Sequence, residues 1–129
     1  MPNWNNGLSA FLTPASSTAG DFNLKTLTAL ADADATLTGA QMSGGLFTIA
    51  PSLARTLTTD TAVAILAAIP GNVDGSHFEF TIVNIGSITA TLSAGVGVTL
   101  VGVGTVTTAA SGTWKVRRNS STTVSVFRT

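Results

Sequence analysis

Hydrophobic and polar residues alternate along residues 78–100, FEFTIVNIGSITATLSAGVGVTL, and this pattern predicts β-strands. Phe78 and Phe80 alternate with Glu79 and a threonine, as expected for a strand with one buried face. Glycines interrupt the alternation twice, and the same pattern then resumes. Three strands separated by turns predict a β-meander, in which consecutive strands are neighbours in one sheet.

Elsewhere the sequence predicts one clear helix, over about residues 60–69. Asp60 or Thr61 can cap its first N–H groups, and Pro70–Gly71 ends it. Residues 62–69 are apolar on every side, so we expect this helix to be buried nearly all round. Further strands are predicted at 46–51, 53–57, 101–106, 114–118 and 122–128. About eight strands with turns this frequent are typical of an all-β fold, an antiparallel jelly-roll-like sandwich or small barrel.

Residues 1–30 differ from the rest, and we divide the chain into an N-terminal arm (1–30) and a β domain (31–129). Proline, glycine and asparagine punctuate the arm, yet it carries large apolar residues that a disordered tail would lack. The side chains that could serve as anchors on a partner are Trp4, Leu8, Phe11 and Leu12. The alternative is an arm that folds back on its own domain, and the sequence favours neither.

Composition limits the kinds of function that the chain can have. Its 129 residues match one domain, it has no cysteine, and its formal net charge is zero, which argues against general nucleic-acid binding. Only 9% of residues are charged, and residues 80–114 carry no charge at all. Such β-rich surface is prone to aggregate unless it is covered, so we expect an obligate oligomer. The alternative is a monomer whose surface is mostly formed by the 22 threonines and 12 serines.

Neither a secretory signal nor a membrane-spanning helix is recognisable in the sequence. The first seven residues lack positive charge, and no apolar segment with a cleavage site follows. The uncharged stretch is interrupted by Gly, Thr and Ser, which is typical of strands. We therefore expect a protein made in a cytoplasm, without a membrane partner.

Three features suggest chemistry, but each has a simpler structural explanation. The glycines of residues 95–104, GVGVTLVGVG, lack the following helix or the lysine that a phosphate-binding loop needs, and bulges or close backbone contacts explain them better. Asp32 and Asp34 could ligate calcium but lack the other ligands of an EF-hand, so a solvated turn is favoured. His77, the only histidine, has no nucleophile motif beside it. We therefore predict no enzyme activity, no metal and no cofactor.

The basic residues gather near the C-terminus, where Lys115, Arg117, Arg118 and Arg128 lie. Strand alternation places Arg117 opposite Trp114 and puts Arg118 on the side of Trp114. This cluster could bind an acidic protein or polysaccharide. The favoured interpretation is a solvated last hairpin whose charges protect a sheet edge.

Two long segments resemble the small capsid decoration (cement) proteins of tailed bacteriophages. They are TLTGAQMSGGLFTIAPSLARTLTTDTAVAILAAI and PGNVDGSHFEFTIVNIGSITATLSAGVGVTLVG, within a similarity that covers roughly residues 36–129. The resemblance implies a compact β-barrel or jelly roll that assembles as a homotrimer on the capsid exterior and clamps neighbouring copies of the major capsid protein. It implies no small-molecule substrate.

From the pattern and the resemblance together, we expect a virion structural protein located on the outer surface of the capsid. The arm residues Trp4, Leu8, Phe11 and Leu12 are the candidates for capsid contact. Candidates for the trimer interface come from the uncharged block and are Val96, Val98, Leu100, Val103 and Val106. The alternative is a receptor- or carbohydrate-binding module at a phage fibre tip, with Trp114 as the exposed aromatic platform.

Overall fold

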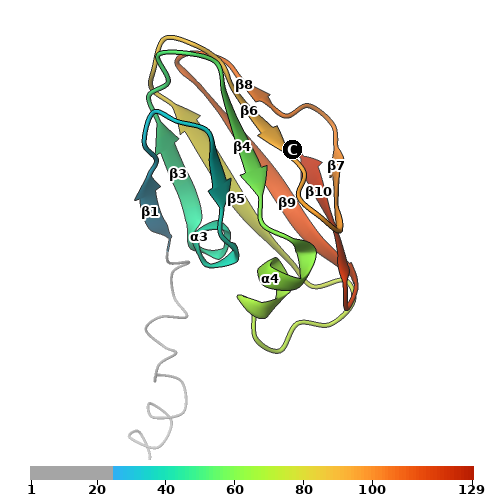
Figure 1. Cartoon of the computed structure of the whole chain (residues 1–129). Helices are drawn as coiled ribbons and strands as arrows, with labels where there is room; N and C mark the ends of the chain where they lie inside the picture. Colours follow the sequence, from blue (N-terminus) through green and yellow to red (C-terminus); the bar gives the residue numbers. More distant parts are fainter. Residues whose placement is uncertain (1–24) are drawn as a thin grey trace, which may run out of the picture.

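A computed structural model describes residues 25–129, which form ten strands and two short helices. In chain order these are β1 Thr26–Ala29, β2 Ala35–Leu37, α3 Gly39–Gly44, β3 Gly45–Ile49, β4 Arg55–Thr59, α4 Ala62–Ala67, β5 His77–Asn84, β6 Ala90–Ser93, β7 Val98–Val101, β8 Thr105–Val106, β9 Ala110–Ser120 and β10 Thr123–Arg128. A six-stranded sheet has the order β1-β3-β5-β9-β10-β7, and a four-stranded sheet has the order β2-β4-β6-β8. The two sheets face each other across one core (Figure 1).

The first half of the described chain winds from one sheet to the other and back, so that successive coils stack. β1, β3 and β5 are parallel neighbours in the six-stranded sheet. β2, β4 and β6 are parallel neighbours in the four-stranded sheet. Helices α3 and α4 lie at the lower end of Figure 1, where the chain leaves the four-stranded sheet and the next coil begins.

The expected antiparallel jelly roll or small barrel is therefore wrong, because both sheets are mixed and largely parallel. Only three of the eight strand pairs are antiparallel, namely β5–β9, β9–β10 and β6–β8. The predicted meander is wrong too, since β5 and β7 lie in the six-stranded sheet, where they are not neighbours, and β6 lies in the other. Alternation reports that a strand has one buried face, but it does not identify the strand's partner. Parallel pairing requires crossovers, and returning through the second sheet and a short helix supplies them.

Helix α3 forms in a glycine-rich segment outside the one helix that the sequence predicted. The Thr38 hydroxyl accepts a hydrogen bond from the Gln41 N–H (3.1 Å), and the Gln41 side chain accepts one from the Thr38 N–H (3.0 Å). This reciprocal pair is a capping box. Gly45 ends the helix with a φ of 91°, a left-handed conformation that favours glycine. Both signals are visible in the sequence as Thr-x-x-Gln followed by a glycine pair.

Helix α4 lies within the predicted span but is shorter and less buried than expected. Thr61 caps its first turn, and Asp60 accepts hydrogen bonds from the Thr61 N–H and from the Gly39 N–H of α3, both at 2.9 Å. Val63 is 58% exposed, so the prediction of a helix buried nearly all round is wrong. The helix covers the lower end of the core with one face only.

The last two strands form the hairpin that the sequence predicted. β9 and β10 pair antiparallel, and β9 also pairs antiparallel with β5, so this hairpin extends the six-stranded sheet. β7 then adds to β10 in parallel. At the other edge of the same sheet, residues 26–29 of the predicted arm form β1.

Aromatic side chains occupy the centre of the core. The Phe80 ring stacks on Trp114 with centroids 5.5 Å apart and meets Phe47 edge-on at 6.0 Å. All three residues are fully buried. Because large aromatic side chains dominate core energetics, we expect this cluster to carry much of the stability of the fold.

Asn84 is a buried polar residue that joins the two sheets. It lies at the end of β5, and its side-chain amide donates to the carbonyl oxygens of Val106 in the other sheet (2.9 Å) and of Ile88 (2.8 Å). Its side-chain oxygen accepts a hydrogen bond from the Gly86 N–H (2.9 Å). Its polar atoms are therefore satisfied although the residue is fully buried.

Candidate interaction surfaces

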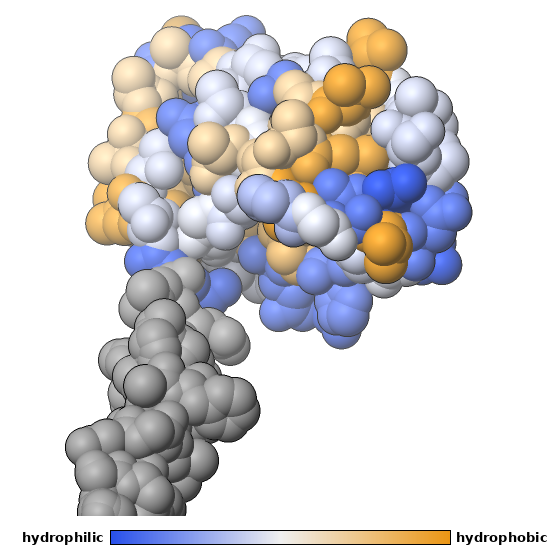
Figure 2. Space-filling view, turned by 90° about the horizontal axis from the view of Figure 1, so that it is seen from below, coloured by the Kyte–Doolittle hydropathy of each residue, from blue (hydrophilic) through white to orange (hydrophobic). Residues whose placement is uncertain are grey.

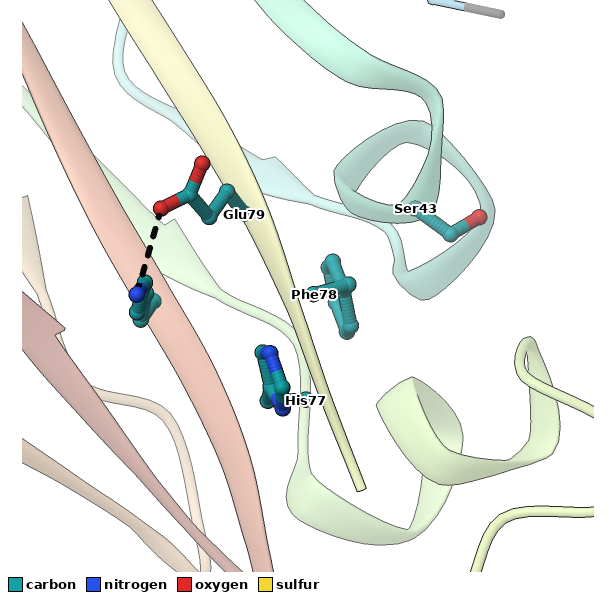
Figure 3. A pocket seen from close by; sticks show the side chains of 5 residues that line it. Ser43, His77, Phe78 and Glu79 are labelled. Atoms are coloured by element: carbon teal, nitrogen blue, oxygen red, sulfur yellow. Dashed lines mark ion pairs between the residues drawn. The ribbon is translucent and has the colours of Figure 1, made fainter. Parts of the chain in front are cut away.

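The histidine lies in a shallow depression on the outer face of the six-stranded sheet, shown in Figure 3. Ser43 of α3, Phe78, Glu79 and Lys115 line it with His77. The Ser43 hydroxyl donates to the Ala40 carbonyl oxygen of its own helix (2.9 Å), and no hydrogen bond links it to His77. The geometry of residues 25–129 therefore provides no relay from a base to a nucleophile at this position.

The charges in this depression are weakly coupled. The Lys115 ammonium lies 3.8 Å from the Glu79 carboxylate, and both side chains are nearly half exposed. An exposed ion pair of this kind contributes at most about 1 kcal/mol. The same face continues to Arg117 and Phe127, which line a second shallow hollow with His77 and Lys115. The polar and charged side chains of this surface can make contacts with a partner.

The four basic residues of the C-terminal region have separate roles. As predicted, Arg117 is exposed on the face opposite Trp114, while Arg118 is partly buried on the other face. Arg118 bonds to the Asp74 carboxylate (2.9 Å), and Arg128 donates to the carbonyl oxygens of Val103 (3.1 Å) and Thr105 (3.0 Å). The patch available for an acidic partner is therefore reduced to Lys115 and Arg117.

The two aspartates, for which the sequence favoured a turn over a calcium site, lie in the turn between β1 and β2. Asp32 accepts hydrogen bonds from the Arg55 guanidinium (2.8 Å) and from Ser52, and these lower its pKa from 3.8 to about 2. Asp34 accepts a hydrogen bond from the Thr56 N–H (2.9 Å). Within residues 25–129, no three His, Asp or Glu side chains group closely enough to hold a metal ion.

The glycines of residues 95–104 allow tight turns and close backbone contact, as the sequence indicated. Gly97 and Gly102 have φ of 79° and 96°, values that side chains rarely adopt. A Cβ at Gly104 would overlap the Leu92 carbonyl oxygen, and one at Gly95 would overlap that of Thr59. These glycines therefore serve packing between β-strands.

The five candidates for the trimer interface have different environments. Val96 and Val103 are 78% and 58% exposed and lie just beyond opposite ends of β7. Val98 and Leu100 are partly buried against the core. Val106 is 2% exposed and belongs to the core, so it offers no surface to a partner. The capsid-contact candidates Trp4, Leu8, Phe11 and Leu12 lie outside the described residues.

The most prominent surface feature of residues 25–129 is exposed apolar area that the sequence analysis did not locate. Beside Val96 and Val103, eight more large hydrophobic residues are exposed: Leu27, Leu53, Val63, Val73, Ile85, Ile88, Val101 and Phe127. Leu53, Ile85 and Ile88 come from loops at the upper end in Figure 1. The lower end, seen from below in Figure 2, also carries hydrophobic areas beside a hydrophilic region. Val63 of α4 contributes there with Val96, whose carbonyl oxygen accepts a hydrogen bond from the first residue of α4 (2.9 Å).

Hydroxyl side chains cover the outer face of the four-stranded sheet, in contrast to the apolar ends of the domain. Two rows cross its strands: Thr36, Thr58 and Ser93, and Thr56, Thr91 and Thr105. None of the six is fully buried, and none is charged. This face can be hydrated without a partner, whereas the apolar ends cannot be hydrated at low cost.

Comparison of the chain with protein-family models, with curated proteins and with solved structures found no match. In the described part of the chain, no helix is long and apolar enough to span a membrane.

Proposed function

We propose that this chain is a structural protein of a virion, a homotrimer that decorates the outer surface of an assembled capsid and stabilises it. The observation that carries the proposal is the exposed apolar surface, with ten large hydrophobic side chains 37–78% exposed in residues 25–129. Single exposed hydrophobic residues are normal, but groups of them at both ends of so small a domain favour partners on those ends.

The low charge supports the same proposal. Six acidic and six basic residues serve 129 positions, and Asp32, Asp74, Arg118 and Arg128 are engaged in bonds within the domain. Charge keeps protein surfaces apart in solution, so a surface this poor in free charge favours association. An assembled capsid shell presents many identical binding positions, so such a protein can bind the shell and also contact its own copies at adjacent positions.

The proposed mechanism is mass action. A protein that binds the assembled shell, and not its separate subunits, stabilises the shell by an amount that grows with the logarithm of its free concentration above its Kd. Three linked copies strengthen weak individual contacts, because the second and third contacts form at high effective concentration. No cofactor or bond-breaking step enters this mechanism. The fibre-tip alternative loses its main support, because Trp114, its proposed aromatic platform, is fully buried.

Purified particles test this function. We expect the chain to co-sediment with intact virions in a fixed copy ratio to the major capsid protein, measured by quantitative mass spectrometry. Particles stripped of the chain should lose heat resistance, and adding back the purified chain should restore it. Virions that lack the chain, or whose heat resistance does not change when it is removed, would contradict the proposal.

Substitutions that introduce a charged residue identify which end of the domain binds the shell. Ile85→Asp changes the upper end and Val63→Asp the lower end, and both side chains are more than half exposed, so the fold should tolerate them. We expect at least one variant to fail in the add-back assay. Thr105→Asp, on the hydroxyl-covered face, is the matched control and should restore heat resistance as the unmodified chain does.

A further inference from the structure

At one end of the stacked coils, β1 and β2 each have an edge that pairs with no other described strand. β1 is the outer strand of the six-stranded sheet, β2 is the outer strand of the other, and no described residue pairs with their outer sides. The Leu30 N–H donates to the Thr48 carbonyl oxygen of β3 (2.8 Å). In a parallel pair, every second residue of a strand directs its N–H and C=O groups to the same neighbour. Leu30 faces β3, so the backbone groups of Leu27 and Ala29 face the open side.

The opposite end of the stack is closed by side chains. There the edge strands are β7 and β8, and the Arg128 guanidinium binds the carbonyl oxygens of Val103 and Thr105. The Trp114 indole N–H also donates to Val103 (3.3 Å). Natural proteins protect sheet edges with such charged side chains. The β1 edge has no comparable cover among residues 25–129, and Leu27 beside it is 57% exposed.

The sequence before β1 repeats the spacing of the shortest coil, which runs from β1 to β3. Leu27 and Leu46 are partners across β1 and β3 and lie 19 positions apart. The same step upstream of Leu27 reaches Leu8, so the segments GLSAF, TLTAL and GLFTI follow one another at this interval. Their fifth residues are Phe11, Leu30 and Ile49. Leu30 packs against the core and Ile49 lies in it, so Phe11 has the character that the inward position requires.

We propose that residues 7–11 of the same chain pair in parallel with β1 and add one strand to the six-stranded sheet. The 24 residues before Lys25 exceed the 19 that separate partners in β1 and β3, and they lead directly into β1. Leu8 then extends the column of Leu27 and Leu46, and Phe11 covers Leu30. The added strand satisfies the open backbone groups of β1, the mode known as β-augmentation. This inference does not depend on the function proposed above, and it assigns Leu8 and Phe11 to the fold instead of to the capsid contact.

Paired cysteines in the full chain test both the pairing and its register. Adjacent strands lie about 4.8 Å apart, and a disulfide requires Cα atoms about 4.4–6.8 Å apart. The double variant Leu8→Cys, Leu27→Cys should therefore form a disulfide within one chain. In the control, Leu8→Cys with Leu46→Cys, the cysteines are two strand spacings apart and should stay reduced. The chain has no natural cysteine, so each disulfide reports on the introduced pair alone.

Non-reducing electrophoresis and intact mass distinguish the outcomes. An internal disulfide in the first pair and none in the control supports the proposal. A disulfide-linked dimer would assign the β1 edge to a second copy and overturn it, as would two unreacted pairs or equal reaction of both.

Hydrogen exchange on the unmodified full chain gives a second test that no substitution can disturb. The Leu27 and Ala29 amides should exchange as slowly as that of Thr28, which faces β3, and their rates should not change on dilution. Fast exchange at Leu27 and Ala29, or protection that is lost on dilution, would refute an added strand from the same chain.

Discussion

Replacing Trp114 with alanine is expected to lower the free energy of unfolding by about 4 kcal/mol, in line with the cost of truncating a buried aromatic residue. Trp114 is fully buried, stacks on Phe80 and lies under the Arg128 guanidinium, whose central carbon is 4.8 Å from the ring centroid. The variant loses these contacts and the indole bond to Val103 together. Because a domain is stable by only about 5–15 kcal/mol, urea denaturation should show a much lower midpoint.

Phe127→Ala is the matched control for this prediction. Phe127 is an aromatic residue on the neighbouring strand β10, but it lies on the outer face and is 37% exposed. Its truncation should cost well under half as much as that of Trp114. If the two variants were equally stable, Trp114 would not occupy the core, and the assignment of faces along β9 would be incorrect.

Asn84→Leu is expected to lower the free energy of unfolding by about 3 kcal/mol, since each buried polar group left without a partner costs about 1–3 kcal/mol. The change preserves approximate side-chain size but leaves the carbonyl oxygens of Val106 and Ile88 and the Gly86 N–H without their partner. The same denaturation experiment measures the loss.

Asn119→Leu is the control for the Asn84 variant. Asn119 is exposed, and its side chain bonds to Ser125 and Arg117 at the surface. Water can replace these bonds, so the substitution should change stability by no more than about 0.5 kcal/mol. A small effect at Asn84 would mean that its link between β5 and β8 does not hold the sheets together.

The sequence predicted individual elements well where the signal was local. The alternation at residues 78–84 marked β5, and the strand before Pro51 corresponds to β3. Of the two residues expected to cap α4, Asp60 and Thr61, it is Thr61 that occupies the N-cap. The relation of Arg117 and Arg118 to Trp114 also followed from strand alternation alone. In each case the deciding interaction lies within a few residues, so it is recorded in the local pattern.

Strand partners were not predictable in the same way. β3 and β5 pair across 35 positions, from Leu46 to Thr81, and nothing in either strand distinguishes a parallel from an antiparallel neighbour. Parallel pairing depends on the connection by which the chain returns to the same sheet, and this connection includes α3 or α4. Helix α3 is only six residues long and contains three glycines counted with its C-cap, so apart from its Thr38–Gln41 capping box the local sequence gives little indication of a helix.

Burial decides which of the predicted contact residues can reach a partner, and strand alternation alone did not predict that burial. Val106 was chosen from the uncharged block as an interface residue, yet it packs in the core with Leu92 and Ala90 of β6. Leu53 is the first residue of a strand predicted over 53–57, and Ile85 lies within the alternating stretch, so neither was a candidate for contact. The structure places both in loops between strands. The low charge did not identify which apolar residues are exposed. Only the three-dimensional positions show that several of them, including Leu53, Ile85 and Val63, lie at the ends of the domain.

Native mass spectrometry of the full chain at micromolar concentration measures whether this charge-poor chain assembles with copies of itself. We predict one dominant species of three chains, each of 13.0 kDa, that persists on tenfold dilution. A single 13.0 kDa chain throughout the concentration range would contradict the proposed homotrimer.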